Sequence, residues 1–299
     1  MKEAPSPAAS SRPARKPKRA LLNGTETDGD DAPAVSAYIR AMFIDSHCHL
    51  NYEGLIEDQP GVLARARAAG VAKMLNISTR VSEWDAVIGT AERESDVMAS
   101  VGIHPHEADI HPDIETETLV EKARHPRVIA IGESGLDYYY DRSDRARQRQ
   151  SFRAHVAASR ETQLPLIVHT RDAEEDTHRI LAEEMEKGAY PALIHCFTAS
   201  QAFADQVLAL GLYVSISGIV TFKNARDLQA TARTIPLDRL LIETDSPFLA
   251  PVPHRGRPCE PAFVADTARF LAALRDEPVE RLAEATSANF YRLFAKAAA

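Results

Sequence analysis

Short apolar runs alternate with helical patterns along most of the chain, beginning at Phe43. Most of these runs are continuous stretches rich in Val, Ile and Leu, which is typical of parallel strands covered on both faces. They predict eight strands, at residues 43–46, 71–77, 97–102, 128–131, 166–168, 192–194, 212–215 and 240–242. The stretches between them predict helices at residues 61–69, 82–92, 145–162, 173–186, 200–210 and 225–234, among others.

The spacing of the predicted strands favours a closed barrel over an open sheet. Successive strands begin about 28 residues apart, a natural length for one strand followed by one helix. A doubly wound open sheet also alternates strands and helices, but it usually has fewer strands and gathers its ligand-binding groups at one switch point. The fold class is therefore predicted to be α/β, a (β/α)8 TIM-type barrel over residues 42–296.

Residues 1–41 differ from the rest of the chain. They are rich in Pro, Ala, Ser and charged residues and show no apolar periodicity, so we predict a disordered N-terminal extension. A basic arm for nucleic acid and a transit peptide are alternatives, but a dispensable extension fits the composition best. Met42 directly precedes the first strand and is a candidate start of translation.

Composition narrows the class of protein further. The 299 residues are 44% hydrophobic, enough for one large domain with its own core. Three cysteines without framework spacing indicate reduced thiols, and no secretory or membrane-spanning segment is evident, so a cytoplasmic protein is expected. The net charge of −8 argues against broad nucleic-acid binding unless bound cations supply positive charge locally. We expect a monomer.

Histidines and carboxylates occur where the predicted strands end. Because the carboxyl ends of barrel strands form one ring, side chains at these positions are expected to converge. Two histidines separated by one residue after the first strand should also face the same side. The six candidates are His47, His49, Glu133, His169, His195 and Asp245.

This set of side chains predicts a two-metal site. Imidazole and carboxylate ligands suit Zn or Mn, and four histidines with two carboxylates exceed the needs of one catalytic metal. Taken singly, each residue is better explained as a structural histidine or a turn residue. Six of them at the ends of five strands are not explained by folding, because unpartnered buried polar groups are costly.

Several ordered motifs resemble those of the TatD family of metal-dependent deoxyribonucleases. The resemblance extends from residue 42 to about residue 296. It is carried by the segments 43–50 (FIDSHCHL), 102–106 (GIHPH), 131–139 (IGESGLDYY), 168–172 (VHTRD), 195–198 (HCFT), 243–249 (ETDSPFL) and 253–256 (PHRG).

The resemblance implies a role for each ligand. His47, His49 and Asp245 would bind one divalent metal, His169 and His195 a second, and Glu133 would bridge them. It also points to Mg²⁺ as a metal that supports activity, besides Zn or Mn. The implied activity is 3′→5′ exonuclease cleavage of single-stranded DNA, with RNA as a further candidate, and Asp245 would orient or deprotonate the attacking water.

Basic residues after the strands are candidates for binding the substrate's phosphates. Tyr138, Tyr139 and Tyr140 are candidates for stacking on a base or for rim packing. Cys48 and Cys196 flank predicted ligands, and we expect them to point away from the barrel mouth as buried thiols. The candidate phosphate contacts are His104, Arg171, Lys223, His254 and Arg255, with His106 as a further rim residue.

Two other functions are compatible with a barrel of this kind. An amidohydrolase acting on a small amide, ester or lactone would use the same metals, because fold and metals do not choose the substrate. Glu133 stands where such an enzyme could carry a modified lysine, which favours the nuclease. An inactive binding scaffold would be expected to lack ligands, and all six are present.

Overall fold

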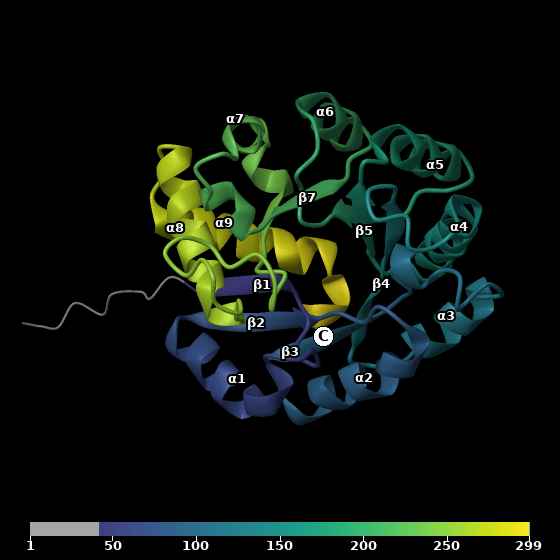
Figure 1. Cartoon of the computed structure of the whole chain (residues 1–299), viewed down its shortest axis with the longest axis horizontal. Helices are drawn as coiled ribbons and strands as arrows, with labels where there is room; N and C mark the ends of the chain where they lie inside the picture. The colour runs from purple at the N-terminus through teal and green to yellow at the C-terminus, as the bar shows by residue number, and fades with distance from the viewer. Residues whose placement is uncertain (1–41, 299) are drawn as a thin grey trace, which may run out of the picture. The chain divides into compact units, whose positions relative to one another are not determined.

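The computed structural model describes residues 42–298, so the predicted N-terminal extension lies outside the described residues. Eight parallel strands form one sheet in chain order (Figure 1). Their bounds are β1 Phe43–Cys48, β2 Val71–Asn76, β3 Val97–Val101, β4 Val128–Asp137, β5 Leu166–Arg171, β6 Ala192–Ile194, β7 Tyr213–Ile216 and β8 Leu240–Ile242. The predicted barrel and all eight predicted strands are confirmed.

The segment that follows β8 returns to β1 and brings the two edges of the sheet together. Asp245 donates its backbone N–H to the carbonyl of His47 at 2.9 Å, and His49 donates its own to the carbonyl of Ser246 at 2.8 Å. Cys48 and Ser246 form an isolated parallel bridge. The barrel is thus closed next to the predicted metal ligands.

Helices surround the strands, as Figure 1 shows. Two of them begin at conventional caps: Asp144 accepts hydrogen bonds from the backbone of Ala146 and Arg147, and Ser200 accepts one from Phe203. The helices are α1 Gln59–Ala68, α2 Trp84–Arg93, α3 Thr116–Ala123, α4 Arg145–Thr162, α5 Glu174–Glu186, α6 Gln201–Ala209, α7 Arg226–Thr234, α8 Val264–Leu274 and α9 Val279–Leu293. Within residues 42–298, no helix is both long and apolar enough to cross a membrane.

The last helix packs against the amino ends of the strands. Phe290, Leu293 and Phe294 join a buried cluster with inward-facing residues such as Ile44 and Leu241. Asn289 donates to the carbonyl of Leu237, shortly before β8, at 2.7 Å and to that of Leu240, at the start of β8, at 2.9 Å. One end of the barrel is therefore filled by α9, which leaves the carboxyl ends of the strands for the site.

Strand β4 is longer than predicted, and Glu133 lies inside it rather than at its end. The sequence after Ile131 lacks an apolar pattern, but Ser134 to Asp137 pair with β5. Gly135 makes this pairing possible: its φ is +147°, and a Cβ there would lie 1.9 Å from the carbonyl oxygen of His169. Two ligand-bearing strands thus run close together at the mouth of the barrel.

Candidate metal centre

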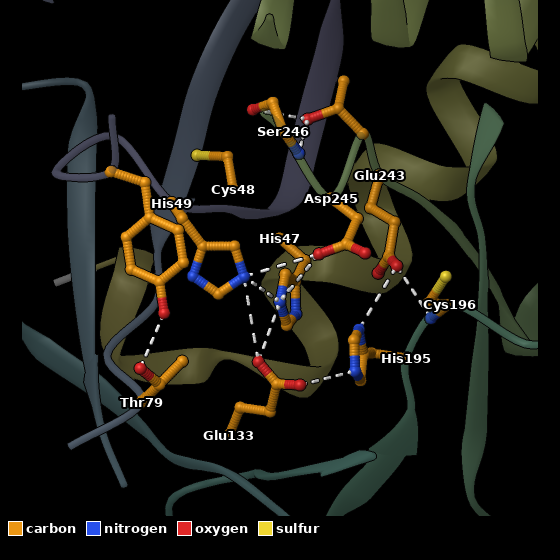
Figure 2. A network of polar contacts seen from close by, with 12 residues as sticks. His47, Cys48, His49, Thr79, Glu133, His195, Cys196, Glu243, Asp245 and Ser246 are labelled. Carbon is orange, nitrogen blue, oxygen red and sulfur yellow. Dashed lines mark hydrogen bonds and ion pairs between the residues drawn. The ribbon is translucent and has the colours of Figure 1, made fainter. Parts of the chain in front are cut away.

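The six predicted ligands converge at one end of the barrel. His47 lies in β1 and His49 directly after it, while His195 follows β6 and Asp245 follows β8. Figure 2 shows Glu133 between the pair His47 and His49 on one side and His195 on the other. Side chains separated by up to 198 positions in sequence thus approach to within 3.6 Å of each other.

One half of the centre consists of His47, His49 and Asp245. The Nε2 atoms of the two histidines are 3.3 Å apart. Asp245 Oδ1 lies 3.6 Å from His47 Nε2 and 3.4 Å from His49 Nε2. Glu133 presents its Oε2 to the same two nitrogens, at 3.3 and 3.8 Å. Four side chains therefore direct acceptor atoms toward one small volume.

The other half consists of His169 and His195. Glu133 Oε1 lies 3.0 Å from His195 Nε2 and 3.2 Å from His169 Nδ1, and these two nitrogens are 3.4 Å apart. The two oxygens of Glu133 thus face different halves of the centre. Such an arrangement suits a carboxylate that bridges two cations.

The donor set fits metal ions better than it fits a purely hydrogen-bonded cluster. His47 and His195 are stacked, with ring centroids 4.0 Å apart, although both would be repelled if protonated. The Nδ1 atoms of His47, His49 and His195 are buried and have no hydrogen-bond partner. Nitrogen and oxygen ligands of this kind are those of zinc and other first-row metals.

Glu133 is held as a carboxylate. Burial raises its pKa, but the charges of His195 and His104 and hydrogen bonds from His169 and His195 outweigh burial, and its pKa lies well below the usual range. An ionised carboxylate at this position can accept hydrogen bonds from, or bind cations in, both halves of the centre.

Two buried carboxylates stand behind the second half of the centre only. Asp137 Oδ2 lies 3.2 Å from His169 Nε2 and 2.8 Å from His106 Nε2. Glu243 Oε1 lies 3.4 Å from His195 Nδ1 and accepts the backbone N–H of Cys196 at 2.7 Å. Such carboxylate–histidine pairs orient a ligating ring and fix which nitrogen carries the proton.

The sequence analysis did not identify Glu243. The signal was present, because Glu243 precedes Asp245 by two residues at the end of an apolar strand. The sequence analysis also did not identify Asp45, which accepts hydrogen bonds from the backbone and hydroxyl of Thr244 at 2.9 and 2.6 Å. Burial raises the pKa of Asp45 to about 8, although the bonds from Thr244 lower it.

His104 also approaches Glu133, but the nitrogen that faces Glu133 is the one that carries the proton. Its Nδ1 accepts the backbone N–H of His106 at 3.1 Å, so the neutral ring carries its proton on Nε2. That Nε2 lies 3.4 Å from Glu133 Oε1. His104 is therefore placed as a hydrogen-bond donor beside the centre.

A cavity of about 690 Å³ opens over the centre. Of the predicted phosphate contacts, His104 and Arg171 line it. Sequence reasoning did not identify Tyr52, Arg80, Arg142 and Phe248 as members of its wall. The lining residues are His49, Tyr52, Thr79, Arg80, His104, His106, Glu107, Glu133, Tyr140, Arg142, His169, Thr170, Arg171, His195, Cys196, Thr198, Ile219, Asp245, Phe248 and Leu249.

Three predicted phosphate contacts are absent from the cavity lining. His254 stacks on Phe263 at 3.7 Å, and its Nε2 lies 2.9 Å from Asp266 Oδ2. The Arg255 guanidinium lies over the ring of Phe222, 3.7 Å from its centroid. Lys223 is exposed. The loop after β8 thus uses its basic residues for local packing instead of directing them over the centre.

The two cysteines behave differently. Cys48 is buried and donates its Sγ to the carbonyl of Leu75, as expected for a thiol pointing away from the mouth. The prediction is wrong for Cys196, which lines the cavity. Strand alternation does not extend to Cys196, because β6 ends at Ile194 and Cys196 has a φ of +44°. Burial raises the pKa of both thiols well above the usual value, which argues against a thiolate nucleophile.

A closed parallel barrel with paired histidines and a shared carboxylate gathered at one end is typical of metal-dependent hydrolases. Residues 44–295 match the model of the TatD-related DNase family. The chain therefore belongs to the TatD family.

Relatives and solved structures agree with this assignment. The metal-dependent hydrolase YcfH of Escherichia coli K12 is 45% identical over 256 residues, which cover 85% of this chain and 96% of that protein. The metal-dependent hydrolase YabD of Bacillus subtilis is 38% identical, covering 85% of this chain and 99% of its own. The crystal structure of YjjV, a TatD homologue from E. coli K12, superposes with a TM-score of 0.78 at 27% identity, covering 86% and 99% of the two chains.

Proposed function

We propose that this hydrolase is a two-metal 3′→5′ exonuclease that removes nucleotides from the end of single-stranded DNA. The observation that carries the proposal is the position of Glu133, whose two oxygens face separate histidine pairs at 3.0–3.8 Å. Membership of a family described as TatD-related DNases supports a phosphodiester substrate. The first half coincides with a group of side chains that could hold one metal ion, His47, His49 and Asp245. The second half is inferred from the distances of His169 and His195 to Glu133.

The six predicted ligands would hold two divalent cations, which would supply Lewis-acid chemistry by lowering the pKa of water and neutralising phosphoryl charge. The side chains of the site then carry the remaining steps. Asp245 faces the cavity, and its carboxylate can accept the proton of the attacking water. The water oxygen forms a bond to phosphorus, the bond from phosphorus to the 3′-oxygen of the shortened strand breaks, and that oxygen takes up the proton held by Asp245. The products are a 5′-mononucleotide and a strand with a free 3′-hydroxyl.

His104 is positioned to assist this reaction. The hydrogen on its Nε2 points into the volume beside Glu133 and can be donated to a non-bridging phosphoryl oxygen as charge accumulates there. Glu133 keeps the two halves in register because it contacts both.

The size of the cavity favours a strand end as substrate. A volume of about 690 Å³ is in the range that encloses a compact organic ligand, which is the scale of a nucleotide. A duplex does not enter a cavity of this size, so its internal phosphates stay away from Glu133 unless the strand end frays.

A cleavage assay tests this proposal. A 5′-labelled single-stranded oligonucleotide is incubated with the protein and Mg²⁺, Mn²⁺ or Zn²⁺, alongside an EDTA control, the His169→Ala variant, an RNA of the same sequence and a model lactone. We expect a metal-dependent ladder of shortened DNA, and its loss in His169→Ala. Intact DNA together with lactone hydrolysis would overturn the nuclease assignment in favour of an amidohydrolase. Inertness of a folded protein that binds no metal would overturn catalysis altogether.

A further inference from the structure

Exposed aromatic side chains concentrate at the mouth of the cavity. Tyr139, Tyr140 and Phe248 are 57%, 48% and 51% exposed. Tyr140 and Phe248 line the cavity directly. Large aromatic residues at the surface lose favourable burial, so their gathering beside a polar centre indicates a binding surface for a flat, apolar group.

The tyrosines, however, are already covered by arginines. The Arg171 guanidinium lies 4.0 Å from the ring centroid of Tyr139 and 4.6 Å from that of Tyr140, and Arg142 lies 5.3 Å from the Tyr140 centroid. Tyr138, the third predicted stacking residue, is covered by another arginine and donates its hydroxyl to a carboxylate on α5. These rings therefore serve to orient guanidinium groups.

Phe248 is free of such cover. Within residues 42–298, no cation lies over its ring, which meets Tyr52 and His49 edge-on at centroid distances of 6.2 and 6.3 Å. Tyr52 in turn stacks on His49 at 4.6 Å and is anchored through its hydroxyl to Thr79 at 2.6 Å. Phe248 and Tyr52 thus form an aromatic wall that is packed directly against a metal ligand.

Two arginines line the cavity across the barrel order from β1 and β8: Arg142 follows β4, and Arg171 ends β5. Arg142 and Arg171 are exposed and have no ion pair with a carboxylate among the described residues, whereas Arg80 at the same cavity is paired with Glu83 and Glu107. Unpaired guanidinium groups held by tyrosines in a chain of net charge −8 are suited to phosphate binding. A nucleotide strand therefore meets an apolar wall on one side and two phosphate-binding groups on the other.

We propose that Phe248, supported by Tyr52, is the stacking platform for the base of the 3′-terminal nucleotide, while Arg142 and Arg171 bind the phosphates upstream. This assignment rests on the proposed exonuclease function. Phe248 lies three residues after Asp245 and in contact with His49, so a base stacked there belongs to the nucleotide beside the centre. Stacking on one aromatic ring recognises any base, because every base offers a π face.

The test removes the ring and the base separately. Three oligonucleotides are compared: one unmodified, one with an abasic tetrahydrofuran residue at the 3′ end, and one with that residue two positions further upstream. The variant Phe248→Leu keeps an apolar side chain without an aromatic face, and Phe248→Trp restores one. Tyr291→Ala, an exposed aromatic on α9 outside the cavity lining, is the matched control.

For the unmodified and upstream-abasic strands, we expect Phe248→Leu to raise KM and lower kcat/KM roughly tenfold. Wild type should lose about the same factor on the terminally abasic strand, where Phe248→Leu should have no further effect. Phe248→Trp should match wild type, and Tyr291→Ala should change nothing. Equal loss on all three strands in Phe248→Leu would overturn the platform, as would unimpaired cleavage of the terminally abasic strand by wild type.

Binding without cleavage separates this inference from the proposed function. In EDTA, fluorescence anisotropy of the same labelled strands should show the same tenfold, base-dependent loss of affinity in Phe248→Leu. If wild type cleaves no DNA but the base-dependent loss persists, the exonuclease proposal fails while the stacking platform stands. If Kd is unaffected by both the base and the ring, the platform fails whatever the cleavage assay shows.

Discussion

The buried carboxylate of Glu243 predicts that the two halves of the metal centre respond unequally to a single substitution. Glu243 is fully buried, and its Oε1 lies 3.4 Å from His195 Nδ1. Its Oε2 has no hydrogen-bond partner, an arrangement that a nearby positive charge would compensate. Among the described residues, no ion pair joins a carboxylate to the Nδ1 atom of His47 or His49, whereas Glu243 lies beside that of His195. Glu243→Gln should therefore weaken only the half that contains His195.

The expected magnitude follows from what the substitution keeps and what it removes. The glutamine carbonyl can still accept the N–H of Cys196, so the local fold is retained. The negative charge that faces His195 is lost, and with it the enhanced basicity of the ring. Removing such an outer partner typically lowers metal affinity 10–100-fold, which corresponds to about 1 to 3 kcal/mol.

Competition between the protein and a chromophoric chelator for Zn²⁺ measures this effect. Wild type should show two binding phases, and Glu243→Gln should shift one of them by the expected factor while the other is unchanged. Glu184→Gln, a buried glutamate on α5 outside the cavity lining, is the matched control and should shift neither. Two unchanged phases in Glu243→Gln, or equal weakening of both with an unaltered melting temperature, would refute the reasoning.

Two further predictions concern stability. Burial lowers the pKa of His155 to about 4, and the neutral ring accepts the backbone N–H of Ile103 on Nε2 at 3.0 Å. The contribution of His155 to the free energy of unfolding is therefore complete above the unfolded-state pKa of about 6.5 and is lost as the pH falls toward 4. In EDTA, the stability difference between wild type and His155→Gln should therefore shift against wild type by roughly 2 to 3 kcal/mol between about pH 7.5 and pH 4.5 in urea titrations; a pH-independent difference would contradict this. Gly135→Ala should lower the free energy of unfolding by about 3 kcal/mol or more, because the added methyl would meet the carbonyl oxygen of His169. The control Gly211→Ala, where φ is +79° but the space is open, should lower it by only about 1 to 2 kcal/mol. Equal losses in urea titrations would contradict the close approach of β4 to His169.

The fold was predictable because each strand can be recognised from its own local sequence. Runs such as 128–131 and 166–168 are continuous, buried and apolar, and the parallel barrel places all their carboxyl ends on one ring. The positions of several candidate ligands could be predicted for the same reason, because His169 and His195 directly follow apolar runs. Their convergence needed only the topology, without any knowledge of side-chain packing.

The remaining features depend on tertiary contacts that the sequence pattern does not carry. Glu133 was expected at a strand end, but β4 continues because Gly135 lets it pair closely with β5. His254 is a plausible phosphate contact by position, yet it stacks on Phe263. Cys196 was expected to follow strand alternation, which a left-handed backbone interrupts. In each case a local rule was overridden by a neighbour distant in sequence.

The segment that follows β8 explains why barrel closure and chemistry cannot be separated in this protein. Glu243 supports His195, and Thr244 ties the segment to β1 through Asp45. Asp245 faces the first half of the centre, and the ring of Phe248 lines the cavity. These side chains, all within six residues, close the sheet and fix the positions of a supporting carboxylate, a predicted ligand and part of the cavity wall relative to one another. A change that loosens this closure should therefore disturb metal binding and substrate contacts together, even when it lies outside the cavity.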